Sequence, residues 1–140
     1  MSSFNKLAHS VWKCKYHIVW CPKYRYKILQ GELRKSLWEI IVQLCEWKKL
    51  EILSCNIQED HVHLVLSIPP KNSVSEIVGF LKGKSAIKIF DHHSSLKKRY
   101  WGCHFWAKGY CVSTVGLDEE KIKKYVKWQQ NKDKNIENNS

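Results

Sequence analysis

The chain has 140 residues, 44% of them hydrophobic, and includes seven Trp, six Tyr and four Phe; this composition fits one packed domain and excludes an intrinsically disordered protein. Lys and Arg outnumber Asp and Glu by 24 to 13, which gives a formal net charge of +11 and a pI near 9.4. Such an excess favours a polyanionic partner, nucleic acid first and an anionic membrane second.

A membrane partner is not expected, because no stretch approaches the roughly 20 apolar residues of a membrane span. Residues 1–10 also lack the apolar core of a signal peptide. We therefore expect a cytoplasmic protein.

The first half of the chain predicts a strand, a helix and a hairpin. Residues 16–20 are β-branched and aromatic and are closed by Pro22, which is typical of a strand. Residues 31–49 carry apolar side chains at spacings of three and four, which predicts an amphipathic helix. Residues 51–58 and 61–68 are separated by a short break, so we expect an antiparallel hairpin that ends before Pro69.

The second half predicts two further helices and one strand. A helix should run from Ser73 to about residue 90, followed by a basic, irregular connection. Residues 105–112 look like a fourth strand that Gly109 can bend. The last helix should run from 118 to about 130, because acids crowd its first turn and lysines follow, in keeping with the helix dipole.

The predicted order is β-α-β-β-α-β-α, within one domain over residues 1–130. Its first six elements are those of an α+β, ferredoxin-like or RRM-like antiparallel sheet with two helices on one face and the other face available. Residues 131–140 are polar and should form a flexible C-terminal tail. A fold of this kind hosts many functions, so it does not decide between them.

The six cysteines predict reduced, mostly buried thiols. They are widely spaced, contain no Cys-x-x-Cys pair and have apolar or aromatic neighbours. A zinc site at Cys103, His104 and Cys111 is a weak alternative, because no fourth ligand accompanies it at a usual spacing.

His61 and His63 form the most informative pattern of the chain. Alternate residues of a strand point to the same face, so the two imidazoles should lie side by side, roughly 6.6 Å apart at the backbone, close enough to share a metal ion. The alternative is a pair of partly buried histidines with ordinary hydrogen bonds. Glu59 has the same strand parity and could be a third ligand or orient an imidazole, unless it lies in the hairpin turn.

Tyr125 and Gln129 are four residues apart and should share a face of the last helix. Ile122 and Val126 mark a neighbouring apolar stripe that can dock the helix onto the body of the protein. Taken alone, Tyr125 could be a half-buried aromatic residue and Gln129 a solvated one.

The combination of these features resembles the HUH nucleases, and most closely the small single-tyrosine transposases of the TnpA type, which mobilise insertion sequences as single-stranded DNA. The resemblance covers most of the chain. Its motifs are the run 15–25 (KYHIVWCPKYR), the run 60–64 (DHVHL), the run 81–85 (LKGKS) and the run 113–116 (STVG).

The resemblance implies that Tyr125 is the nucleophile, forming a covalent 5′-phosphotyrosine, and that His61, His63 and Gln129 bind a divalent metal, Mg²⁺ or Mn²⁺. It also implies a homodimer in which the helix of Tyr125 can complete the partner's site. The expected partner is single-stranded DNA with hairpin ends. The ligand set itself suits Mn²⁺, and Mg²⁺ with help from water and phosphate, while imidazole also suits Zn²⁺.

Basic side chains of the second helix and of the connection after it are candidate phosphate contacts. These candidates are Lys82, Lys84, Lys88, Lys97, Lys98 and Arg99. Some of them could serve only as solubilising surface charge.

Three other functions stay open at this point. Within the same chemistry they are an HUH replication initiator or relaxase, and a domesticated relative that processes hairpins. From a different class, a non-catalytic domain that binds single-stranded nucleic acid would explain the charge and the aromatic residues, but it gives the paired histidines no role.

Overall fold

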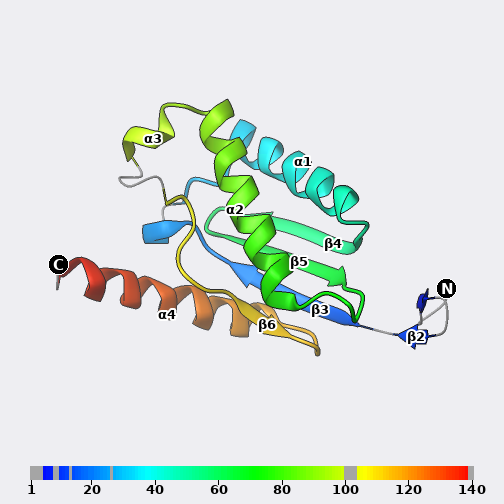
Figure 1. The fold of residues 1–140 in the computed structure, drawn as a ribbon. Helices are drawn as coiled ribbons and strands as arrows, with labels where there is room; N and C mark the ends of the chain where they lie inside the picture. The colour runs from blue at the N-terminus through cyan, green and yellow to red at the C-terminus, as the bar shows by residue number, and fades with distance from the viewer. Residues whose placement is uncertain (1–4, 8–9, 13, 26, 100–103, 139–140) are drawn as a thin grey trace.

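A four-stranded antiparallel sheet forms the centre of the computed structural model (Figure 1), which describes residues 5–7, 10–12, 14–25, 27–99 and 104–138. The strand order is β4-β5-β3-β6, so the two central strands are not consecutive in the chain. This is the ferredoxin-like order, and the predicted fold class is confirmed. The strands are β3 (Lys15–Trp20), β4 (Glu51–Gln58), β5 (His61–Ser67) and β6 (Cys111–Ser113).

The helices α1 (Gly31–Trp47) and α2 (Val74–His92) cover one face of the sheet (Figure 1). Alternate residues of β3 and β5 point toward these helices and are buried with their apolar stripes. Ser73 caps α2, because its hydroxyl accepts a hydrogen bond from the backbone N–H of Glu76 at 3.1 Å. The sheet residues of this main core are Ile18, Trp20, Val62, Leu64 and Leu66.

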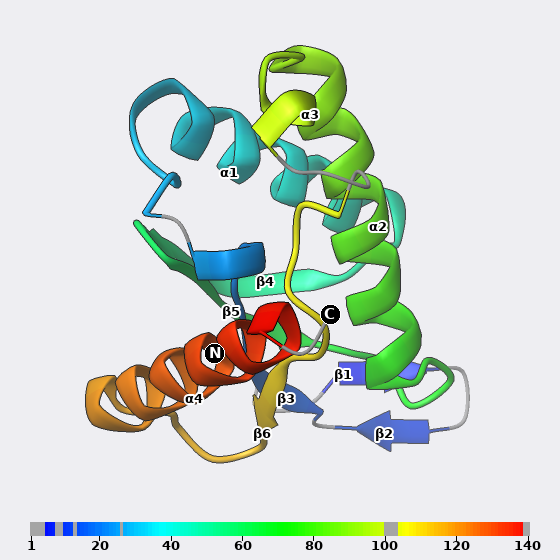
Figure 2. The ribbon, with the colours of Figure 1, turned by 90° about the vertical axis from the view of Figure 1, so that its left-hand side faces the viewer.

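The helix α4 (Glu119–Asn138) lies on the opposite face of the sheet (Figures 1 and 2). Ile122 and Val126 pack against Val19 and Cys21 and form a second, smaller core. The predicted docking stripe is therefore confirmed. The expectation that this face stays available needs a correction, because α4 covers part of it.

The predicted helices and strands before residue 93 are confirmed within a few residues at each end. The last helix is longer than predicted: it continues to Asn138 instead of ending near residue 130. The sequence of its second half is polar and has no apolar stripe. The apolar spacing that predicted the helix therefore stops near residue 130, although the backbone stays helical to Asn138. The flexibility of residues 131–140 and the domain boundary at 130 stay predictions.

Four short elements of the described residues were not predicted. The strands β1 (Asn5–Leu7) and β2 (Ser10–Trp12) form a small antiparallel pair next to the start of β3 (Figure 1). The 3-10 helix η1 (Lys23–Arg25) follows β3. The short helix α3 (Leu96–Arg99) lies in the connection that we expected to be irregular.

Residues 105–112 do not form one continuous strand, so this prediction is wrong. Trp106 forms an isolated antiparallel bridge with Pro22, whereas regular pairing with β3 resumes only at β6. Between them the chain turns at Gly109, whose φ is +85°. Lys82 compensates for the break, because its ammonium donates hydrogen bonds to the carbonyls of Ala107 at 2.8 Å and Gly109 at 2.7 Å.

Cys14, Cys45, Cys55 and Cys111 are free thiols, as predicted. Of the five cysteines that the structure describes, only Cys21 and Cys45 are buried and the other three are half-buried, so the expectation that most are buried is wrong for these five. Burial raises the pKa of Cys45 to about 12 and that of Cys55 to about 11, so both stay protonated at neutral pH. Cys103, which belonged to the alternative zinc site, lies outside the described residues. Across the described ranges, no helix has the length and apolar character needed to cross a membrane.

Candidate active site

His61 and His63 lie on the face of β5 that points away from the main core. Val62 and Leu64 are fully buried on the other face, while both histidines are half-buried. The predicted parity of the strand is therefore confirmed. Because the buried residues fix the register of β5, the two imidazoles are presented together on one face.

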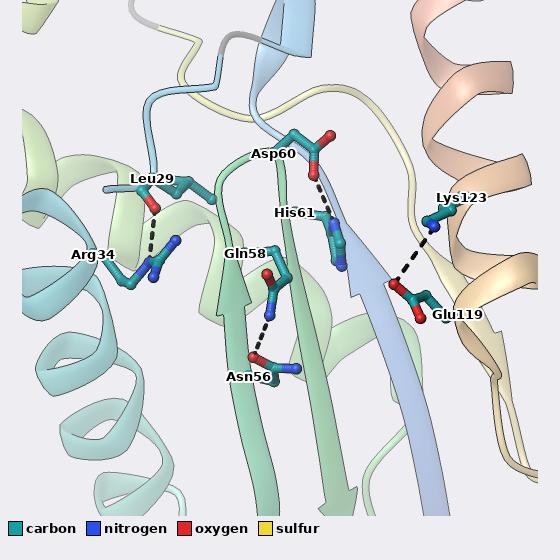
Figure 3. Close-up of polar contacts among 8 residues, drawn as sticks. All are labelled: Leu29, Arg34, Asn56, Gln58, Asp60, His61, Glu119 and Lys123. Carbon is teal, nitrogen blue, oxygen red and sulfur yellow. Dashed lines mark hydrogen bonds and ion pairs between the residues drawn. The ribbon is translucent and has the colours of Figure 1, made fainter. Parts of the chain in front are cut away.

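His61 is held by the residue that precedes it. Its Nδ1 lies 2.8 Å from Oδ1 of Asp60, which is in the turn just before the start of β5 (Figure 3). This hydrogen bond lowers the pKa of Asp60 below its ordinary value, against the opposing effect of burial. The carboxylate therefore stays ionised at neutral pH.

Glu59 does not share this geometry. It lies with Asp60 in the turn between β4 and β5, and its side chain is exposed. Its backbone carbonyl accepts a hydrogen bond from the N–H of Leu29 at 3.0 Å, which ties the turn to the start of α1. The parity argument thus fails at Glu59, as it does in a turn. Its role as a metal ligand stays a prediction.

His17 is a neighbour of the site that the sequence patterns did not identify. Its Nδ1 lies 3.4 Å from Nε2 of His63, and the two ring centroids are 5.6 Å apart. Burial lowers the pKa of His17, and Lys15 lowers it further. Burial also lowers the pKa of His63, with added effects of His17 and His61. The lowered pKa values favour neutral imidazoles, the form that binds metals.

A pocket of about 930 Å³ opens beside the two histidines. Figure 3 shows its two sides. On one side, β4 carries Gln58 and β5 carries His61; on the other, α4 carries Glu119 and Lys123. The pocket is mixed in charge. Its basic lining residues are Lys27, Arg34, Lys123 and Lys127, and its acidic ones are Glu59, Asp60 and Glu119.

Tyr125 and Gln129 are not among the described residues that line this pocket. Gln129 is 1% exposed, and Tyr125 is half-buried against the second core with its ring centroid 6.1 Å from that of Trp128. The face of α4 beside the histidines presents other residues, among them Lys123. One chain thus brings His61 and His63 together, but it does not gather them with Tyr125 and Gln129 around one pocket.

The basic candidates for DNA contacts differ in their surroundings. Lys84 and Lys97 are exposed. The ammonium of Lys88 lies 5.1 Å from the ring centroid of Trp47. Lys82 is used within the chain by Ala107 and Gly109, and burial lowers its pKa to about 8. The side chains of Lys98 and Arg99 lie outside the described part of the structure. Phosphate contact by all six residues stays a prediction.

The family model of IS200-like transposases matches residues 10–129, a range that contains the histidines, Tyr125 and Gln129. The transposase of insertion sequence element IS200 from Salmonella typhimurium is 46% identical over 134 residues, which cover 96% of this chain and 88% of that protein. The ISDra2 transposase TnpA from Deinococcus radiodurans is 36% identical over 124 residues, which cover 88% of this chain and 89% of that one.

Solved structures agree with this match. A Deinococcus radiodurans transposase crystal structure superposes with a TM-score of 0.80 at 31% identity, covering 89% of this chain and 97% of that one. A REP-associated tyrosine transposase, solved bound to a REP hairpin, shares the fold with a TM-score of 0.54 at 16% identity, covering 90% of this chain and 68% of that one.

The α+β fold and these matches define the protein as a DNA transposase. The chain belongs to the IS200-like transposase family. The resemblance that the sequence motifs indicated is thereby confirmed at the level of the family.

Proposed function

We propose that this transposase cleaves and rejoins single-stranded DNA at insertion-sequence ends, using Tyr125 as the nucleophile and a divalent metal at His61 and His63. The observation that carries the proposal is the same-face histidine pair beside a pocket of about 930 Å³, next to the helix that bears Tyr125. A non-catalytic binding domain would have no use for two imidazoles ordered in this way.

The proposed cleavage conserves the energy of the phosphodiester bond. The hydroxyl of Tyr125 loses its proton and its oxygen attacks phosphorus, while the bond from phosphorus to the 3′-oxygen breaks and that oxygen leaves as a 3′-hydroxyl. The downstream strand stays attached through its 5′-phosphate to the tyrosine. Rejoining reverses the exchange when another 3′-hydroxyl attacks the phosphotyrosine, so no nucleotide cofactor is consumed.

The donor atoms of the proposed ligands suit a divalent ion. His61 and His63 supply two neutral nitrogen donors, and the amide oxygen of Gln129 is the proposed third ligand, with Glu59 as its rival. His61, His63 and Gln129 carry no negative charge. A Mg²⁺ or Mn²⁺ ion bound by them would keep its full positive charge and could attract a phosphate group. When bound, the ion would neutralise charge on the scissile phosphate and orient it for in-line attack.

We further propose a homodimer in which Tyr125 and Gln129 act with the histidines of the partner subunit. The support is geometric: both residues lie on α4, yet neither lines the histidine pocket of its own chain. Because Gln129 is 1% exposed and Tyr125 is half-buried in its own chain, α4 would have to move away from its own sheet to present both residues to a second copy. The two subunits would then form two composite sites.

Single-stranded DNA with hairpin ends is the proposed partner. The net charge of +11 supports a polyanionic ligand. The solved tyrosine transposase with the same fold is bound to a REP hairpin, which supports a hairpin as the recognised form. Lys84 and Lys97, whose side chains are exposed, are the best placed of the predicted phosphate contacts.

Covalent trapping tests the proposal. Single-stranded oligonucleotides from candidate element ends are incubated with the protein and Mn²⁺, and denaturing gels separate free protein from a protein–DNA adduct. We expect an adduct for the wild type, none after Tyr125→Phe, and none with a chelator. Tyr110→Phe is the matched control and should leave the adduct unchanged. Hairpin binding without an adduct, unaffected by chelator, would favour the non-catalytic binding domain instead.

A further inference from the structure

Asp60 and His61 form a carboxylate–imidazole pair at the start of β5. The distance from Asp60 Oδ1 to His61 Nδ1 is 2.8 Å, and the two side chains are 30% and 14% exposed. The backbone turn at Glu59 and Asp60 is fixed independently by the bond from the N–H of Leu29. The carboxylate is therefore held against the imidazole by the hairpin itself (Figure 3).

This contact determines which nitrogen of His61 carries the proton. An ionised carboxylate can only accept hydrogen bonds, so the Nδ1 that it contacts must be the protonated nitrogen. A neutral imidazole carries one proton, and the Nε2 of His61 then holds the only free lone pair of the ring. Metal-binding histidines commonly have such a partner, which fixes their tautomer and raises their basicity.

We infer that Asp60 is a positioning residue that holds His61 in the Nδ1–H tautomer and so presents its Nε2 to the divalent metal. The inference rests on the proposed metal site, but it assigns a role to a residue that the sequence pattern did not single out. Asp60 acts through His61, and Glu59, its neighbour in the turn, has no part in this arrangement.

The chain offers a matched set of variants. Asp60→Ala removes the acceptor, whereas Asp60→Asn keeps a neutral amide oxygen that can still accept from Nδ1–H. Glu51→Ala removes an exposed carboxylate at the start of β4, which pairs with Ser67 at the opposite end of β5 from His61. A positioning role predicts that Asp60→Asn resembles the wild type, because the geometry matters more than the charge. If the carboxylate of Asp60 instead coordinated the metal directly, both Asp60 variants would bind the metal more weakly.

The first measurement is made on metal-free protein with ¹⁵N-labelled histidine, by long-range ¹H–¹⁵N NMR at a pH where the rings are neutral. For the wild type, Glu51→Ala and Asp60→Asn we expect His61 in the Nδ1–H form. For Asp60→Ala we expect a mixture of the two tautomers. A wild-type His61 with its proton on Nε2 overturns the inference, whatever the metal affinity.

The second measurement titrates each protein with Mn²⁺ and follows the electron paramagnetic resonance signal of the free ion. We expect Asp60→Ala to bind about tenfold more weakly than the wild type, and the other two variants to bind like the wild type. If Asp60→Ala binds as tightly as Glu51→Ala, the inference is overturned while the metal site stands. If the wild type shows no saturable binding, the metal site itself fails and the inference fails with it.

Discussion

His17 and His63 contact each other across the two central strands of the sheet, with Nδ1 of one ring 3.4 Å from Nε2 of the other. The ladder pairs His17 with Val65 and His63 with Val19, so the two histidines are diagonal neighbours on one face. Between neutral rings, one nitrogen must donate and the other accept. The position of His63 thus depends on a residue more than forty positions earlier in the chain.

Replacing His17 should loosen the ring of His63. We expect His17→Ala to weaken Mn²⁺ binding by about tenfold, the lower end of the range seen when a residue that supports a metal ligand is removed. Lys15→Ala is the control, because Lys15 is exposed on the same strand two residues earlier. Titration with Mn²⁺ measures the effect. Equal affinities for the two variants would show that His17 has no part in the site.

Lys82 should stabilise the fold through the interrupted strand. Its ammonium donates hydrogen bonds to the carbonyls of Ala107 and Gly109, and Lys82→Met removes this donor. We expect a loss of about 2 kcal/mol in the free energy of unfolding, the scale of a hydrogen bond to a charged group. Lys84→Met, on the exposed side of α2, should change it by less than about 0.5 kcal/mol. Urea unfolding of both variants makes the comparison, and equal losses would refute this role.

The same residue predicts a pH dependence. Burial lowers the pKa of Lys82 from 10.5 to about 8, so between these values the unfolded chain binds more protons than the folded one. Stability contributed by this group therefore rises with pH across that window. We expect the difference in unfolding free energy between the wild type and Lys82→Met to increase from pH 7.5 to 9.5. A difference that stays constant or falls would contradict the lowered pKa.

Complementation tests whether Tyr125 acts in trans. Neither Tyr125→Phe nor the double variant His61→Ala/His63→Ala should form a DNA adduct alone. A mixed dimer of the two contains one intact composite site, so we expect an adduct on the histidine-deficient chain, identified by a size tag. Formation of the mixed dimer is checked by native mass spectrometry. A mixed dimer without any adduct would place Tyr125 with the histidines of its own chain.

The parts of the fold that local patterns predict are those in which burial repeats with a fixed period. The alternation of Val62 and Leu64 with His61 and His63 fixes the two faces of β5, and the apolar spacing of α1 fixes its buried stripe. Each pattern needs only a few neighbouring residues, because the side chains of one element meet one core.

The parts that could not be predicted depend on residues far apart in the chain. The contact of His17 with His63 requires the register between β3 and β5, which neither strand specifies alone. The break after Trp106 is compensated by Lys82, which lies on a different element.

The pairing of Asp60 with His61 is local, and a carboxylate next to the first histidine was the signal that could have revealed it.

Peptide mapping of the trapped adduct tests most directly whether Tyr125 is the nucleophile. Wild-type protein is reacted with single-stranded element ends and Mn²⁺, digested with protease and nuclease, and examined by tandem mass spectrometry. We expect one modified peptide, with a nucleotide attached through its 5′-phosphate to the oxygen of Tyr125. A nucleotide on Tyr110 or on any other residue, or one attached through a 3′-phosphate, would contradict it.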